Sequence, residues 1–93
     1  MADYKVTCIT KNPPHSNYHE HITHIGGANW YITREDAIRR IDTGTERFYV
    51  HDAVRNVSVW VGVVRPMRHQ PYLRTYADGD WNDNLLSLGS CHA

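Results

Sequence analysis

Apolar and polar positions alternate along several stretches of the chain, and this two-residue period predicts β-strands. The clearest stretch is residues 57–64, "VSVWVGVV". Its odd-numbered valines share one face, and its even-numbered residues, including Trp60, share the other. Weaker alternation predicts four further strands, at residues 4–10, 19–25, 46–51 and 71–77.

One segment, "YITREDAIRRIDTG", has helical rather than strand periodicity. Thr33 is a good N-cap, and Asp36 three residues later completes a capping box. Gly44 supplies the stop signal. The apolar face is formed by Ala37, Ile38 and Ile41. A helix of about nine residues is too short to be stable alone in water, so it must pack on a sheet.

The predicted elements follow the order ββαβββ, in a single domain covering residues 1–93 and ordered from about 4 to 91. The segments "DGDWNDN" and "LLSL" are expected to be a polar turn and a short closing segment. The fold class is therefore α+β: a mostly antiparallel five-stranded sheet with one helix on a face. If the helix covers the valine face, Trp60, Tyr72, Tyr76 and Tyr49 stand on the open face.

Length and composition restrict the classes that the chain can belong to. Ninety-three residues leave no room for two cores. Ten basic and ten acidic side chains cancel, so nucleic-acid binding would need a local patch. No apolar run is long enough to cross a membrane, and the polar start shows no secretory leader. We expect a cytoplasmic protein with reduced thiols; a Cys8–Cys91 bridge is the alternative.

The histidine-rich stretch "HEHITHIGGANW" raises the question of a metal site. On a strand, His19 and His21 would share a face and could begin a zinc site. No C-x-x-C or H-E-x-x-H spacing supplies the remaining ligands. A hydrogen-bonded polar strand edge is the reading we favour, with no cofactor. "DGDWNDN" lacks the Gly and Glu of a calcium loop, so there too a polar turn is expected.

The same stretch offers a catalytic hypothesis, in which His24, Glu20 and His19 would serve a small metal- or histidine-dependent hydrolase. A histidine oriented by a carboxylate is half of a nucleophile-activating arrangement. However, the chain has no G-x-S-x-G elbow and no phosphate-binding loop. We therefore favour a non-enzymatic role and keep the enzyme as the competing class. His24 itself is expected to be a buried structural residue.

A group of aromatic and basic residues lies on and between the last two long strands. The candidate binding residues are Trp60, Arg65, Arg68, Tyr72, Arg74 and Tyr76. Arginines interleaved with rings on a sheet can stack and neutralise single-stranded nucleic acid or a nucleotide. An exposed aromatic sheet face also suits a protein partner or a second copy of the chain. The leading hypothesis is protein–protein or homodimer association, with nucleic-acid or nucleotide binding as the alternative.

Five blocks of sequence, in order, resemble one family of small prokaryotic proteins. They are "HEHITHIGG", the segment from Trp30 to Ile41, "FYV" at 48–50, "YLRTYADG" at 72–79 and the segment from Asn84 to Cys91. The family is catalogued as domain of unknown function 3892, and the resemblance covers about residues 4–91. It implies a shared fold and no particular activity.

Overall fold

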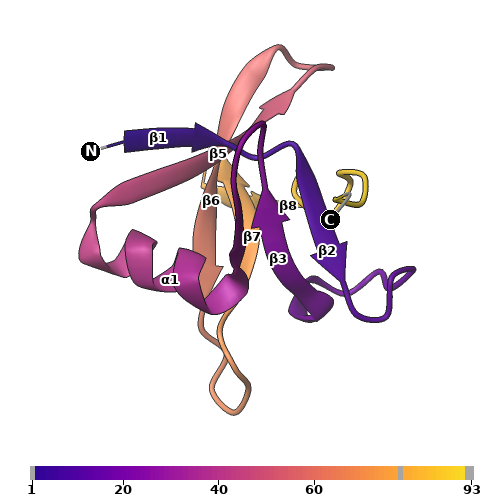
Figure 1. Ribbon diagram of the computed structural model, residues 1–93, viewed down its shortest axis with the longest axis vertical. Helices are drawn as coiled ribbons and strands as arrows, with labels where there is room; N and C mark the ends of the chain where they lie inside the picture. Colours follow the sequence, from indigo (N-terminus) through magenta and orange to yellow (C-terminus); the bar gives the residue numbers. More distant parts are fainter. Residues whose placement is uncertain (1, 78, 92–93) are drawn as a thin grey trace.

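The computed structural model describes residues 2–77 and 79–91 (Figure 1). The strands are β1 (Ala2–Lys5), β2 (Cys8–Lys11), β3 (Ile22–Gly26), β4 (Tyr31–Thr33), β5 (Glu46–Asp52), β6 (Val57–Val64), β7 (Tyr72–Ala77) and β8 (Asp80–Asn82). The helices are the 3-10 helix η1 (His19–His21) and the α-helix α1 (Arg34–Thr43). With about 45% strand and 15% helix, the protein is mostly β.

The larger sheet has the strand order β1-β5-β6-β7-β8. From β5 to β8 each strand pairs antiparallel with the next one along the chain. At the other edge β1 pairs parallel with β5, with Ala2 opposite Glu46. Antiparallel neighbours need only short turns, whereas parallel strands need a long connection. Between β1 and β5 this connection contains the smaller sheet and α1.

The smaller sheet is antiparallel, with the order β2-β3-β4. The chain crosses between the two sheets immediately after β1. The Val6 amide donates to the Tyr49 carbonyl in the larger sheet (2.8 Å), and the next amide, of Thr7, donates to the Gly26 carbonyl in the smaller one (2.9 Å). The predicted single strand at 4–10 is therefore two strands in different sheets.

The helix has the ends that the sequence predicts. The Thr33 side chain accepts a hydrogen bond from the Asp36 amide (3.1 Å), and Gly44 closes the helix with φ 73°. Such a positive φ suits glycine because glycine has no Cβ to clash. Ala37 is fully buried, and α1 packs against β5, β6 and β7 of one sheet and β3 and β4 of the other.

The core lies between the two sheets and α1. It contains Val6, Ile9, Ile22, Ile25, Ala37, Phe48, Val50, Val59, Val61, Leu73 and Leu85. Leu85 belongs to the segment after β8 and has no exposed surface, so this segment closes one side of the core. Burying a side chain of this size stabilises the fold by roughly 1.5–3 kcal/mol.

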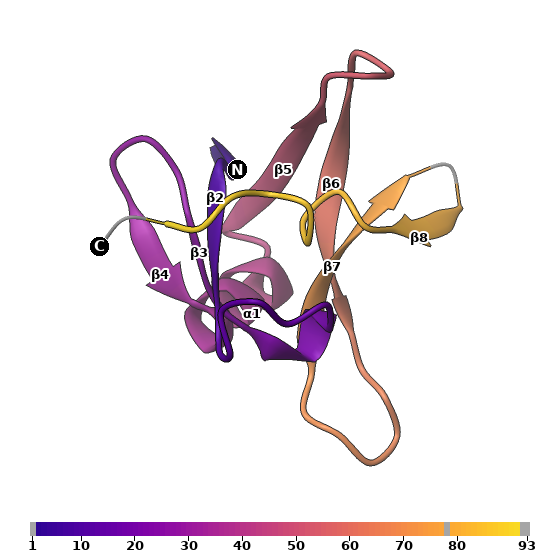
Figure 2. The same ribbon diagram turned by 90° about the vertical axis from the view of Figure 1, so that its right-hand side faces the viewer.

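After β8 the chain returns to the smaller sheet, and Figure 2 shows this segment, in yellow, running back past β2. Ser90 forms a parallel bridge with Ile9, and the Cys91 amide donates to the Ile9 carbonyl (2.9 Å). A disulfide joins Cys8 to Cys91, with 4.9 Å between their Cα atoms. The expectation of reduced thiols is wrong for this structure, which contains the alternative bridge. The bridge lies over Gly26, where an added Cβ would be 2.9 Å from the Cys8 sulfur.

The predicted fold class is wrong in its architecture. Instead of one mostly antiparallel five-stranded sheet there are two sheets, and the larger is mixed. Residues 31–33, predicted to lead into the helix, form a strand. Residues 80–82, predicted to lie in a polar turn, form another. Asp78 of the predicted turn lies outside the described residues. Strands of three residues are too short for alternation to be visible. Within the described residues no helix could span a membrane.

Candidate binding surface

One face of the larger sheet is turned away from α1 and the smaller sheet. On β6, Val59 and Val61 are buried, whereas Trp60 between them is 38% exposed. On β7, Leu73 is buried and Tyr76 is 41% exposed. Alternation thus separates a core face from an open face, with Trp60 and Tyr76 on the open side as the sequence predicts. Val57 is an exception: it lies at the strand end, beyond the core, and is exposed.

Four aromatic side chains form a line across the open face, which we call the aromatic row: Tyr49, Trp60, Tyr76 and Trp81. They come from β5, β6, β7 and β8, and each stands directly opposite the next in the strand register. Because neighbouring strands lie about 4.8 Å apart, the row spans about 14 Å. The last three are each about two-fifths exposed. This places a large aromatic surface in contact with solvent.

The rings of the aromatic row are held by contacts with one another and with the sheet. Tyr49 and Trp60 pack edge-to-face with 5.8 Å between ring centroids, and Tyr76 and Trp81 do the same at 5.1 Å. The Trp81 ring lies over Gly62, where an added Cβ would be 3.1 Å from it. The row is therefore largely preorganised, which lowers the entropy lost on binding.

Both arginines beside the row are paired with carboxylates. The Arg47 guanidinium stacks 4.1 Å from the Trp60 ring centroid and forms a two-pronged ion pair with Asp3 (2.9 and 3.0 Å). Arg74 donates to Asp83 (3.0 Å) at the β8 end of the face. The positive charge of each of these two arginines is therefore matched by a carboxylate.

The structure brings together three of the six predicted binding residues: Trp60 and Tyr76 in the aromatic row, and Arg74 beside it. Tyr72 lies at the other end of β7, 6.3 Å from the His19 ring of η1. Arg65 pairs with Asp42 beside α1, and Arg68 is exposed in the loop between β6 and β7, which Figure 1 shows extending away from the sheets. The predicted basic group is spread over separate parts of the surface.

Sequence reasoning left Trp81 out because it treated residues 78–84 as a polar turn. The signal that could have found it is the Asp-Gly pair at 78–79, a typical hairpin turn, followed by a residue of high strand propensity. Arg47 was also missed. Its place beside Trp60 depends on the pairing of β5 with β6, which the sequence of either strand alone does not show.

The two candidate metal ligands do not share a strand face, because residues 19–21 form a 3-10 helix. His21 is hydrogen-bonded through Nδ1 to the Ser16 hydroxyl (2.6 Å). The His19 side chain is buried, and its Nε2 lies 3.5 Å from a carboxylate oxygen of Asp83. Among the described residues no three His, Cys, Asp or Glu side chains are placed to hold a metal ion.

His19 is buried without a hydrogen-bond partner for Nε2 within the described residues. Burial lowers the pKa of its imidazole below the ordinary value, and the Arg74 guanidinium lowers it further. The Asp83 and Glu20 carboxylates act in the opposite direction. His19 is therefore neutral at neutral pH, as a residue packed for structure would be.

The residues of the catalytic hypothesis are not assembled into a site. His24 is hydrogen-bonded through Nδ1 to the Thr23 hydroxyl (2.9 Å) and stacks on Tyr31 with 4.8 Å between ring centroids. Glu20 is exposed on η1, where its backbone carbonyl accepts from Arg34 (2.8 Å). No carboxylate among the described residues is hydrogen-bonded to His24, so the histidine–carboxylate pair that this chemistry needs is not formed.

Comparison with protein families identifies one match. The model for the protein of unknown function family DUF3892 matches residues 5–89. The chain belongs to DUF3892. Neither a curated protein nor a solved structure matches this DUF3892 chain significantly.

Proposed function

We propose that this DUF3892 protein is a non-enzymatic binding module that associates with a second copy of itself through the aromatic row. The observation that carries this proposal is the register of Tyr49, Trp60, Tyr76 and Trp81, which stand side by side on four strands. Tryptophan and tyrosine are enriched where proteins bind one another, because they bury a large area at a small cost in side-chain entropy.

Charge favours a second copy as the occupant. The chain has ten basic and ten acidic residues, so two copies do not repel one another at neutral pH. Arg47 and Arg74 are paired with Asp3 and Asp83, so little local charge opposes the approach of an identical face. A symmetric dimer of this kind would place one aromatic row against the other.

Single-stranded nucleic acid is the alternative occupant, because rings on neighbouring strands can stack successive bases. Affinity for nucleic acid comes mainly from cations that neutralise phosphates. The two arginines beside the row are already engaged by carboxylates, and a phosphate would have to displace them. We therefore favour a protein partner over nucleic acid.

Sedimentation velocity over a range of micromolar concentrations tests the proposal. We expect the wild type to dimerise, and Trp81→Ala or Tyr76→Ala to weaken the dimer by about 30-fold, the effect of losing about 1 kcal/mol from each of the two copies. The matched control is Tyr18→Ala, which removes an exposed tyrosine away from the row. A wild type that stays monomeric throughout would refute self-association. Salt-sensitive binding of oligothymidine by such a monomer would support the nucleic-acid alternative.

The cytoplasm remains the predicted location. The disulfide argues against this prediction, because such bonds persist mainly in oxidising compartments. Counting free thiols in protein isolated under alkylating conditions would test it. Two alkylated cysteines would support a reducing location, whereas none would show that the disulfide is formed where the protein resides.

A further inference from the structure

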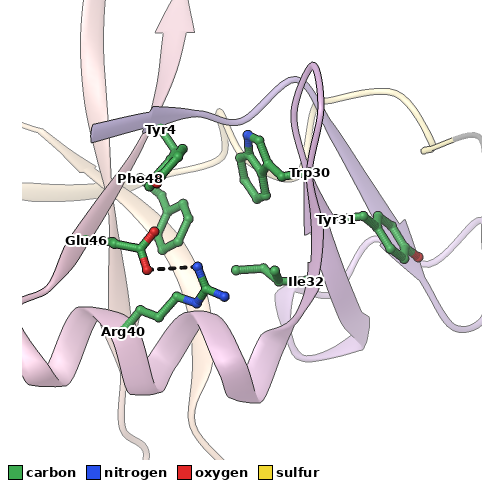
Figure 3. Close-up of a pocket in the computed structure, with 7 residues that line it drawn as sticks. All are labelled: Tyr4, Trp30, Tyr31, Ile32, Arg40, Glu46 and Phe48. Atoms are coloured by element: carbon green, nitrogen blue, oxygen red, sulfur yellow. Dashed lines mark hydrogen bonds and ion pairs between the residues drawn. The ribbon is translucent and has the colours of Figure 1, made fainter. Parts of the chain in front are cut away.

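A cavity of about 290 Å³ lies between the two sheets, on the side of the larger sheet opposite the aromatic row. Figure 3 shows Tyr4 and Phe48 on one wall, Trp30 and Ile32 facing them, and Arg40 and Glu46 at the α1 end. These residues come from β1, β5, the segment leading into β4, β4 itself and α1. The cavity is at the small end of the range for ligand sites, a size that suits a molecule with a single ring.

Three rings form most of the cavity wall. Tyr4 and Phe48 are stacked with 5.9 Å between centroids, and Trp30 lies 5.4 Å from Phe48. Trp30 is held in place because its indole crosses Gly27, where an added Cβ would be 2.2 Å from Nε1. A flat aromatic molecule would meet ring faces and edges that are already fixed.

The α1 end of the cavity is polar. Arg40 donates to Oε1 of Glu46 (2.8 Å) and to Asp36 (3.1 Å), so two carboxylates share its charge. These contacts raise the pKa of Arg40, which therefore stays protonated. The Glu46 side chain is only 18% exposed, and its second oxygen, Oε2, accepts no hydrogen bond from the described residues. This oxygen is therefore a free acceptor, reached by water, to which the N–H group of a ligand could donate instead.

We propose that the cavity binds a small planar aromatic molecule that carries a cationic or strongly donating N–H group, such as an amidine or an amino-substituted heterocycle. The ring packs against the surface that the mutually packed rings of Tyr4, Trp30 and Phe48 form, and the N–H group donates to Oε2 of Glu46. Arg40 and Glu46 both line this end, but the Arg40 charge is already shared by Glu46 and Asp36, whereas Oε2 of Glu46 is free. A cation therefore gains a charge-assisted hydrogen bond at Oε2, and a carboxylate meets a guanidinium that is already paired.

Three probes of one shape separate the contribution of charge from that of the ring: benzamidine, benzamide and benzoate. Each is titrated into ¹⁵N-labelled protein while the amide and indole signals of the cavity residues are followed. We expect benzamidine to bind about tenfold or more tightly than benzoate, with benzamide between them. The shifts should centre on Trp30 and Phe48. Cavity signals unmoved by millimolar benzamidine, or an affinity for benzoate equal to that for benzamidine, would overturn the proposal.

Two variants locate the interaction. Glu46→Gln should abolish the preference for benzamidine over benzamide, whereas the control Glu35→Gln, at an exposed glutamate of α1, should retain it. Ile32→Phe fills the cavity without changing its charges and should remove binding of all three probes. If Glu46→Gln does not fold, Ile32→Phe still tests the proposal. Benzamidine binding that persists in Ile32→Phe would show that the probe does not bind in the cavity. None of these results depends on the oligomeric state.

Discussion

Opening the Cys8–Cys91 disulfide should be the most destabilising single covalent change that the fold allows. The two cysteines are 83 residues apart, so the bridge closes nearly the whole chain into one loop. In the chain-entropy model, a loop of this length removes about 15 cal/mol/K from the unfolded state, or about 4.5 kcal/mol at 25 °C. A domain of this size has a total stability of roughly 5–10 kcal/mol. Reduction should therefore leave the protein close to unfolding.

The native structure should change little on reduction. The Cys91 amide still donates to Ile9, and Leu85 remains in the core, so the C-terminal segment keeps non-covalent attachments. The effect should appear in equilibrium unfolding by urea, followed by tryptophan fluorescence with and without a reductant. The double variant Cys8→Ser/Cys91→Ser serves as the control and should unfold like the reduced wild type under both conditions. A free energy of unfolding that reduction lowers by less than about 1 kcal/mol would refute the loop-entropy reasoning.

Three further predictions concern the core, the buried histidine and the aromatic row. Leu85→Ala should lower the free energy of unfolding by about 2–5 kcal/mol in urea titrations, because it leaves a cavity in the core. The pKa of His19 is lower in the folded protein than in the unfolded chain. Below about pH 6.5 the unfolded chain therefore binds more protons than the folded protein, and the free energy of unfolding decreases as the pH decreases. His19→Leu should reduce this loss of stability, measured as the urea midpoint between neutral and acidic pH, whereas the substitution of an exposed histidine, His51→Leu, should not. The same pH dependence of the urea midpoint in the wild type and both variants would contradict the role given to His19. Gly62→Val should displace the Trp81 ring and weaken self-association in sedimentation runs while the urea midpoint stays near wild type.

The sequence alone determined the elements whose information is local. Residues 57–64 alternate over a full eight positions, and the strand has those bounds. The helix was predicted with its N-cap Thr33 and its stop at Gly44, because caps depend on residues a few positions apart. The division of Val59 and Trp60 between the buried and exposed faces followed from the same alternation. DUF3892 membership was also apparent from blocks of sequence read in order.

Tertiary structure decided what depends on partners distant in the chain. Nothing local to "YKVTCIT" shows that the chain changes sheets at Val6, because that change follows from hydrogen bonds to Tyr49 and Gly26. The aromatic row exists only through the pairing of β5 to β8, and the cavity only through the approach of β4 to β1 and α1. Periodicity reports which way a side chain points along its own strand, whereas register and sheet assignment are set by which distant segments bury their apolar faces together.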